Sequence, residues 1–145
     1  MMRVTVDAVD VRRQLARIGD MMAGHAADRT AEDLEAQIED AAGAHTKTGA
    51  LFRSVTKARV PGGWEISHDA QIAPYAVFVH WGTRPHRIEP RKKRALRWPG
   101  GGAGFVFSRG VNHPGYAGDA WMVRAAADAP RIFAAHVARL IQSEG

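Results

Sequence analysis

A helical repeat of apolar residues near the N-terminus constrains the fold of this chain more than any other feature. The residues of the repeat are Val11, Leu15, Ile18 and Met22. Their spacings of three and four residues place them on one face of an α-helix, and the same phase continues to Ala41. We therefore predict one long helix over residues 9–42, with Gly19 and Gly24 as its weakest points because glycine is a poor helix former.

The rest of the chain predicts short antiparallel strands followed by a second helix. Residues 51–57 alternate in polarity, Pro61-Gly62-Gly63 is typical of a turn, and residues 64–68 follow as the partner strand. The apolar run over residues 72–83 is typical of a buried turn of helix or a buried strand. Residues 105–107 predict another short strand.

Asp119 can cap a C-terminal helix that begins at Ala120, and Asp128 and Pro130 predict a restart or kink within it. The fold class is therefore α+β, with the long N-terminal helix and the C-terminal helix packed on a small, mainly antiparallel β-sheet with long loops. The 145 residues suit one domain, so we expect a single domain over residues 1–145.

Composition removes several classes of function. The chain has no cysteine, which excludes disulfides, thiol catalysis and thiolate metal sites. No apolar run approaches the roughly 20 residues that a membrane-spanning helix needs. We expect a basic domain that is made and kept in a cytoplasm, without a signal peptide, a membrane partner or a cofactor.

The net charge of +5 is distributed unevenly. Residues 84–97 hold seven basic residues and one acid, whereas residues 7–40 hold nine acids and four arginines. This distribution is compatible with two solvated faces, with a nucleic-acid patch, or with a complementary pair of self-association surfaces.

Motifs of catalysis and of metal or phosphate binding are missing. The seven histidines show no helical pairing of the zinc-protease type, and the glycine-rich stretch at residues 100–104 lacks dinucleotide or nucleotide-loop spacing. No serine stands in a nucleophile-elbow pattern. We therefore predict no catalytic and no metal-binding residues. Trp98, Phe105 and Phe107 lie near the basic residues, a combination that single-strand binders use.

Three segments, taken together and in order, resemble one known family. They begin with Thr48-Gly49-Ala50-Leu51 after the long helix, continue with residues 74–84, and end with a histidine-proline-glycine loop before the last helix. The residues that carry the resemblance are Thr48, Gly49 and Leu51, then Tyr75, Gly82 and Thr83, then His113, Pro114 and Gly115. We expect Gly82 and Gly115 to lie at positive φ or in tight turns.

This order resembles the tail-component family of long-tailed phages, typified by gene product ten of phage HK-ninety-seven. The resemblance covers about residues 42–127 together with the helical termini. One departure is His80-Trp81, where many members have an acid and an aromatic residue, so no charge-based role is carried over to this position.

The resemblance implies a non-enzymatic virion protein at the head–tail interface, either a neck or a tail-completion protein, assembled in the host cytoplasm. It implies a ring of six-fold or twelve-fold symmetry around the DNA channel that joins the head connector to the tail. The implied partners are other copies of the chain, neighbouring head-connector and tail proteins, and genomic DNA through non-specific contact. A tail terminator and a small basic nucleic-acid-binding module are the alternatives.

A head-to-tail ring needs two different complementary patches on each subunit. We predict that the basic residues form one patch: Arg84, Arg87, Arg91, Lys92, Lys93, Arg94 and Arg97. We predict that the acidic face of the long helix forms the other: Asp28, Glu32, Asp33, Glu35 and Glu39.

Overall fold

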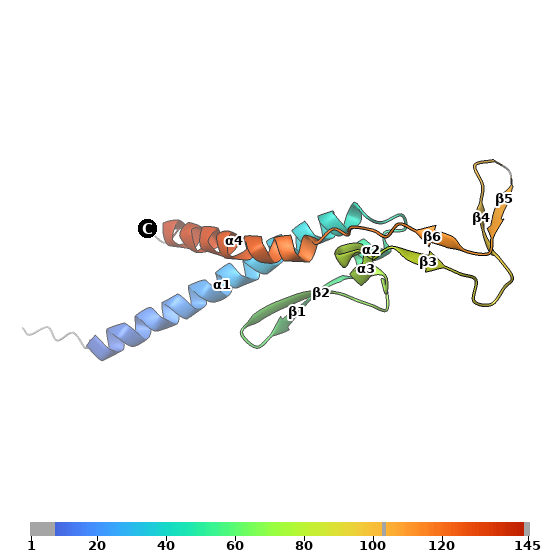
Figure 1. Cartoon of the computed structure of the whole chain (residues 1–145). Coiled ribbons are helices and arrows are strands. Elements are labelled where there is room, and N and C mark those ends of the chain that lie inside the picture. The colour runs from blue at the N-terminus through green and yellow to red at the C-terminus, as the bar shows by residue number, and fades with distance from the viewer. Residues whose placement is uncertain (1–7, 103, 144–145) are drawn as a thin grey trace, which may run out of the picture. The chain divides into compact units, whose positions relative to one another are not determined.

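A computed structural model describes residues 8–102 and 104–143 (Figure 1). The helices are α1 (Ala8–Gly43), α2 (Ala50–Arg53), α3 (Ala76–Trp81) and α4 (Trp121–Ser143). The strands are β1 (Val55–Val60), β2 (Gly63–His68), β3 (His86–Ile88), β4 (Leu96–Pro99), β5 (Phe105–Ser108) and β6 (Val111–His113). Long terminal helices with short antiparallel strands between them confirm the α+β class.

The described strands pair as three separate two-stranded antiparallel sheets, where the sequence predicts one small sheet. The chain also divides into two compact units. Unit 1 comprises residues 1–74 and 121–145, and unit 2 is the segment 75–120 inserted between them.

Small side chains form most of the core of unit 1. α1 packs against α4 and against the β1–β2 hairpin. The largest fully buried side chains are those of Trp121 and Leu51. The remaining buried apolar residues of this unit are Ala26, Ala31, Ile38, Ala42, Val55, Ala73 and Ala125. Alanines let the elements approach closely, but they bury little apolar surface per residue.

The first part of α1 is exposed. Every residue from 12 to 21 is exposed, including Leu15, Ile18 and Met21 with exposed fractions of 63%, 48% and 58%. Leu15 and Ile18, which belong to the apolar face that predicts the helix, are therefore exposed rather than packed in a core. A bare helical segment of this length gains little stability by itself in water.

A short helix replaces the first residues of the predicted hairpin strand. Gly49 has φ 76° and precedes α2, which the Arg53 N–H closes by donating to the Gly49 carbonyl at 2.9 Å. The Arg53 guanidinium also donates to the Thr48 carbonyl at 3.0 Å. These contacts turn the chain so that Leu51 points into the core, and β1 begins only at Val55.

α4 runs through Pro130 as one helix, where the sequence predicts a restart or kink. Asp128 holds this part of α4 to α1, because the Gln37 side chain donates to it at 3.0 Å. Tertiary contact therefore offsets the hydrogen bond that proline cannot make.

Unit 2 is a nested pair of two-stranded ladders beyond α3. β3 pairs with β6, placing His86 opposite His113, and β4 pairs with β5 within that loop. In its described part, residues 75–102 and 104–120, only Ala76 and His80 are buried. Backbone pairing rather than a core therefore holds these ladders.

The apolar run over residues 72–83, expected to be buried, is exposed at six of its twelve residues. Val77, Phe78 and Trp81 of α3 have exposed fractions of 51%, 56% and 64%. The sequence identifies these residues as apolar, but it does not say whether the same chain covers them.

Candidate interaction surface

Two backbone segments of unit 2 meet around Gly82 and Gly115. The Thr83 N–H donates to the Tyr116 carbonyl at 2.7 Å, and the Tyr116 N–H donates back to the Thr83 carbonyl at 2.9 Å. Gly82 has φ 82° and Gly115 has φ 85°, which confirms the expected positive φ at both. A β-carbon at Gly115 would lie 2.5 Å from the Thr83 carbonyl oxygen, and one at Gly82 would lie 2.7 Å from the Ala117 carbonyl carbon. The close approach therefore requires glycine at both positions.

The motif residues around this bridge have structural partners. The Gly115 N–H donates to His113 Nδ1 at 3.0 Å, and the His113 ring stacks on His86 with centroids 5.1 Å apart. Pro114 and Tyr75 are exposed. The structure thus brings Gly82, Thr83, His113 and Gly115 together in unit 2, whereas Thr48, Gly49 and Leu51 lie in unit 1.

The seven basic side chains of residues 84–97, here called the basic arm, are all exposed. Arg87 pairs with Glu89 at 2.9 Å, and Arg97 lies over the Phe105 ring at 3.8 Å from its centroid. The other five make no ion pair among the described residues: Arg84, Arg91, Lys92, Lys93 and Arg94.

Most of these free cations border a groove of about 700 Å³ beside the β4–β5 hairpin. Its lining residues are Pro90, Arg91, Lys92, Lys93, Ala95, Leu96, Arg97 and Phe107. No acidic residue lines it. A positive groove with apolar edges can hold an extended anionic ligand.

The β4–β5 hairpin carries apolar side chains on both faces. Residues opposite each other in an antiparallel pair share a face, so Trp98 and Val106 lie on one face and Phe107 lies opposite Arg97 on the other. Trp98, Val106 and Phe107 are 38%, 41% and 64% exposed. A lone two-stranded hairpin is marginally stable in water, so packing against a partner would stabilise this one.

Four of the five predicted interface acids on α1 already have partners within unit 1. An Asp28 oxygen accepts from Arg59 at 2.8 Å and from Trp64 Nε1 at 2.9 Å. The other pairs are Glu32 with Arg29 at 3.1 Å, Asp33 with His136 at 2.7 Å and Glu35 with Lys57 at 2.6 Å. Glu39 makes no ion pair within the described residues.

The pKa of Asp28 is lowered from its ordinary value, because Trp64 donates a hydrogen bond to the ionised carboxylate and the Arg59 charge lies beside it. The pKa of Asp128 is lowered as well, first by the hydrogen bond from Gln37 and then by Arg131. Both carboxylates therefore connect elements within unit 1 through hydrogen bonds.

Sequence reasoning missed a polar chain in unit 1 that joins the buried Ser54 and Trp121 through the half-buried His68. Trp121 Nε1 donates to His68 Nε2 at 3.0 Å, and His68 Nδ1 lies 2.8 Å from Ser54 Oγ. Ser54 Oγ in turn donates to the Leu51 carbonyl at 2.7 Å. Because Nε2 accepts, the neutral His68 ring carries its proton on Nδ1 and donates it to Ser54.

This pairing of serine and histidine resembles a nucleophile and its base, but its surroundings differ. Ser54 is completely buried, so no substrate reaches its oxygen in this conformation. The distal ring nitrogen of His68 meets the Trp121 indole rather than an orienting carboxylate. The arrangement instead ties β2, α2 and α4 together. A spacing of 14 residues between Ser54 and His68 carries no recognisable signal in the sequence.

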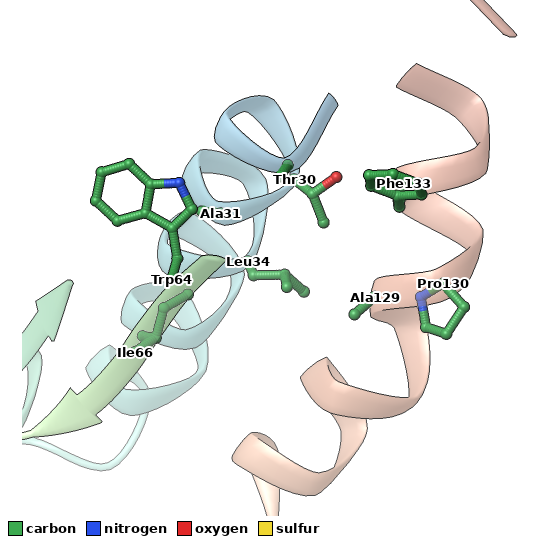
Figure 2. Close-up of a pocket in the computed structure, with 9 residues that line it drawn as sticks. Thr30, Ala31, Leu34, Trp64, Ile66, Ala129, Pro130 and Phe133 are labelled. Atoms are coloured by element: carbon green, nitrogen blue, oxygen red, sulfur yellow. The ribbon is translucent and has the colours of Figure 1, made fainter. Parts of the chain in front are cut away.

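An apolar groove of about 330 Å³ lies between α1, β2 and α4. Figure 2 shows Pro130 and Phe133 of α4 across from Thr30 and Leu34 of α1, with Trp64 on the strand beside them. No charged residue lines it. This groove of unit 1 could accept an apolar side chain.

Across residues 8–102 and 104–143, no group of three or more His, Asp or Glu side chains is placed to hold a metal ion. No helix in this part of the chain is long and apolar enough to cross a membrane. Comparison with known proteins found no matching family model, no matching curated protein and no matching solved structure.

Proposed function

We propose that this chain is a structural subunit of a phage particle, a neck or tail-completion protein at the head–tail interface. In this proposal copies of the chain form a ring around the DNA channel and join the head connector to the tail. The motifs around Gly49, Gly82 and Gly115 carry the resemblance from which the proposal starts.

The observation that best supports an assembly subunit is the exposure of large apolar side chains within each unit. Exposed apolar patches are typical of surfaces that contact another protein.

The exposed apolar residues lie in several places, as contact with several neighbours requires. In unit 1 they include Leu15, Ile18 and Met21 on the first turns of α1. In unit 2 they include Phe78 and Trp81 of α3 and Phe107 of β5. A subunit of a heterologous ring meets a neighbour on each side through different surfaces.

The decisive experiment deletes this gene from the phage genome that encodes it. We expect lysates to contain DNA-filled heads and separate tails by electron microscopy, and a plasmid copy of the gene to restore joined particles. Joined, infectious particles from the deletion would refute the proposal.

Complementation with variants tests which surface assembly requires. A plasmid carrying Leu15→Ser, Ile18→Ser and Met21→Ser should fail to restore joining, because these exposed side chains lose their partners in the assembly. The matched control on the same helix, Arg12→Ser with Arg17→Ser, should restore it. Circular dichroism of both purified chains checks that each is folded.

A further inference from the structure

The four consecutive cations of the basic arm, residues 91–94, lack a counter-charge within the described chain. Their side chains are exposed, and they form no ion pair with a described residue. Unit 2 as a whole has eight basic residues against two acids. Like charges held this close repel one another, so an anionic partner stabilises the segment.

A second copy of this chain offers no matching anionic cluster. Most acids of the α1 face are engaged within unit 1, as the pairs of Asp28, Asp33 and Glu35 show. Among the described acids without an ion pair, Glu39 and Asp40 are adjacent, and their two charges do not match the four cations of residues 91–94. The counter-charge for residues 91–94 therefore comes from a different molecule, and self-pairing through charge alone is disfavoured.

The groove that these cations border fits a phosphate backbone. Three consecutive cations, Arg91 to Lys93, and Arg97 line about 700 Å³ of open space without an acid among them. Residues 91–95 form bends rather than a regular strand, so successive side chains can leave the backbone in different directions. Nucleic-acid phosphates present an extended row of single charges to such a segment.

The aromatic residues of the hairpin favour contact with the backbone over stacking on unpaired bases. Base stacking needs free ring faces in a row. The guanidinium of Arg97 covers the Phe105 ring at 3.8 Å, and Trp98 lies on the opposite face of the hairpin from Phe107. Of the three aromatic residues of the hairpin, Phe107 is the one that lines the groove beside the basic arm.

We propose that the basic arm binds the phosphate backbone of double-stranded DNA without reading its sequence, through residues 91–94 and Arg97. This deepens the proposed function and rests on it for the choice of duplex DNA. The binding itself is a property of the free chain. If the free chain does not bind DNA, the proposed neck function is still tested separately by the assembly of particles.

The test measures binding of the purified full chain to a fluorescently labelled short DNA duplex by anisotropy, between about 50 and 200 mM salt. We expect log K to fall with log salt at a slope of roughly −3.5 to −4.5, as four to five phosphate contacts give. Two duplexes of different sequence should bind equally. No duplex binding at the lowest salt would overturn the proposal.

The arm variant is Arg91→Gln, Lys92→Gln, Lys93→Gln and Arg94→Gln. It should bind at least about 10-fold more weakly at the middle of the salt range and lose most of the slope. The control variant removes the same charge from exposed, unpaired positions of unit 1: Arg12→Gln, Arg17→Gln, Lys47→Gln and Arg139→Gln. It should bind like the natural chain, and equal weakening in both variants would overturn the proposal. Unchanged circular dichroism and thermal midpoints show that both are folded.

Two competitors identify the kind of anion. Poly-glutamate at equal charge concentration should displace the duplex poorly, and displacement equal to that by unlabelled duplex would favour an acidic protein instead. A single strand should bind no more tightly than the duplex. Tighter single-strand binding that disappears in Phe107→Ala would overturn the duplex assignment in favour of base stacking.

Discussion

The two units of this chain are stabilised by different kinds of contact. Unit 1 has a small but closed core around Trp121 and Leu51, and four of the five predicted interface acids on α1 have partners within the unit. Unit 2 buries only Ala76 and His80 among its described residues, and it leaves most of its basic arm unpaired. Backbone bridges and glycines hold unit 2 where side chains hold unit 1.

Residues that stabilise the free chain therefore lie mainly in unit 1, whereas the exposed side chains of unit 2 are available for contact with a partner. In unit 1, substitutions of buried residues should cost stability of the free chain. In unit 2, substitutions at the backbone bridge between Thr83 and Tyr116, next to Gly82, should also cost stability. Substitutions of exposed side chains there should instead affect assembly or binding.

The largest effect is expected from removing the main side chain of the unit 1 core. Trp121→Ala should lower the free energy of unfolding by about 3–5 kcal/mol, because it deletes a buried aromatic ring and leaves a cavity. Urea unfolding followed by circular dichroism measures this. Trp121→Phe keeps most of the volume but loses the hydrogen bond to His68, so it should cost clearly less. Equal costs for the two variants would mean that packing is not the main term.

The next largest effect is expected at the backbone bridge between Thr83 and Tyr116 in unit 2. Gly82→Ala should cost about 1–3 kcal/mol locally, because φ 82° is unfavourable for alanine and the new β-carbon meets the Ala117 backbone. Hydrogen exchange should lose protection at the Thr83 and Tyr116 amides while the α1 amides stay protected. Gly101→Ala, which meets open space, is the control. Loss of protection throughout α1 would show that the two units unfold together.

A smaller effect is expected in the polar chain of unit 1. Ser54→Ala removes the acceptor for the His68 Nδ1 proton and should destabilise unit 1 by about 1–3 kcal/mol. Ser67→Ala, which loses only an exposed hydroxyl pair with Thr56, should stay within about 0.5 kcal/mol. Thermal unfolding of the two variants side by side gives the comparison, and a neutral Ser54→Ala would show that water replaces the hydroxyl.

The smallest effect concerns the ion pairs on the surface of unit 1. The pKa of Asp28 is held below 3.8 by the Trp64 hydrogen bond first and the Arg59 charge next. Because the folded pKa is lowered, its contribution to stability is present above pH 3.8 and is lost as the pH falls through the folded pKa. Trp64→Phe should raise the Asp28 pKa in an NMR titration. An unchanged pKa would assign the shift to Arg59 alone.

The sequence predicted the elements whose signal is local. The spacing from Leu15 to Met22 gave the long helix, and the Pro61-Gly62-Gly63 turn gave the β1–β2 hairpin. Gly82 and Gly115 were expected at positive φ or in tight turns, and both have positive φ. Periodicity and turn chemistry act over a few residues, so a sequence displays them directly.

What the sequence did not predict depends on contacts between distant residues. The pairing of Asp28 with Arg59 and Trp64 joins positions about 30 residues apart or more, and this pairing occupies an acid that looked free for a neighbour. The exposure of Phe78 and Trp81 has the same origin, since apolar character is local but burial is not. Sequence alone also gave no sign of the division into two units.

The bridge between Thr83 and Tyr116 has a consequence for how this chain can vary. It holds the start and the end of the inserted ladders next to each other, through two backbone hydrogen bonds of 2.7 and 2.9 Å. The segment between Thr83 and Gly115 is therefore an insertion whose length and chemistry can change while Gly82 and Gly115 keep the bridge. An exchange of residues 84–114 for another hairpin of matching ends, with Gly115 retained, would give the same chain a different ligand.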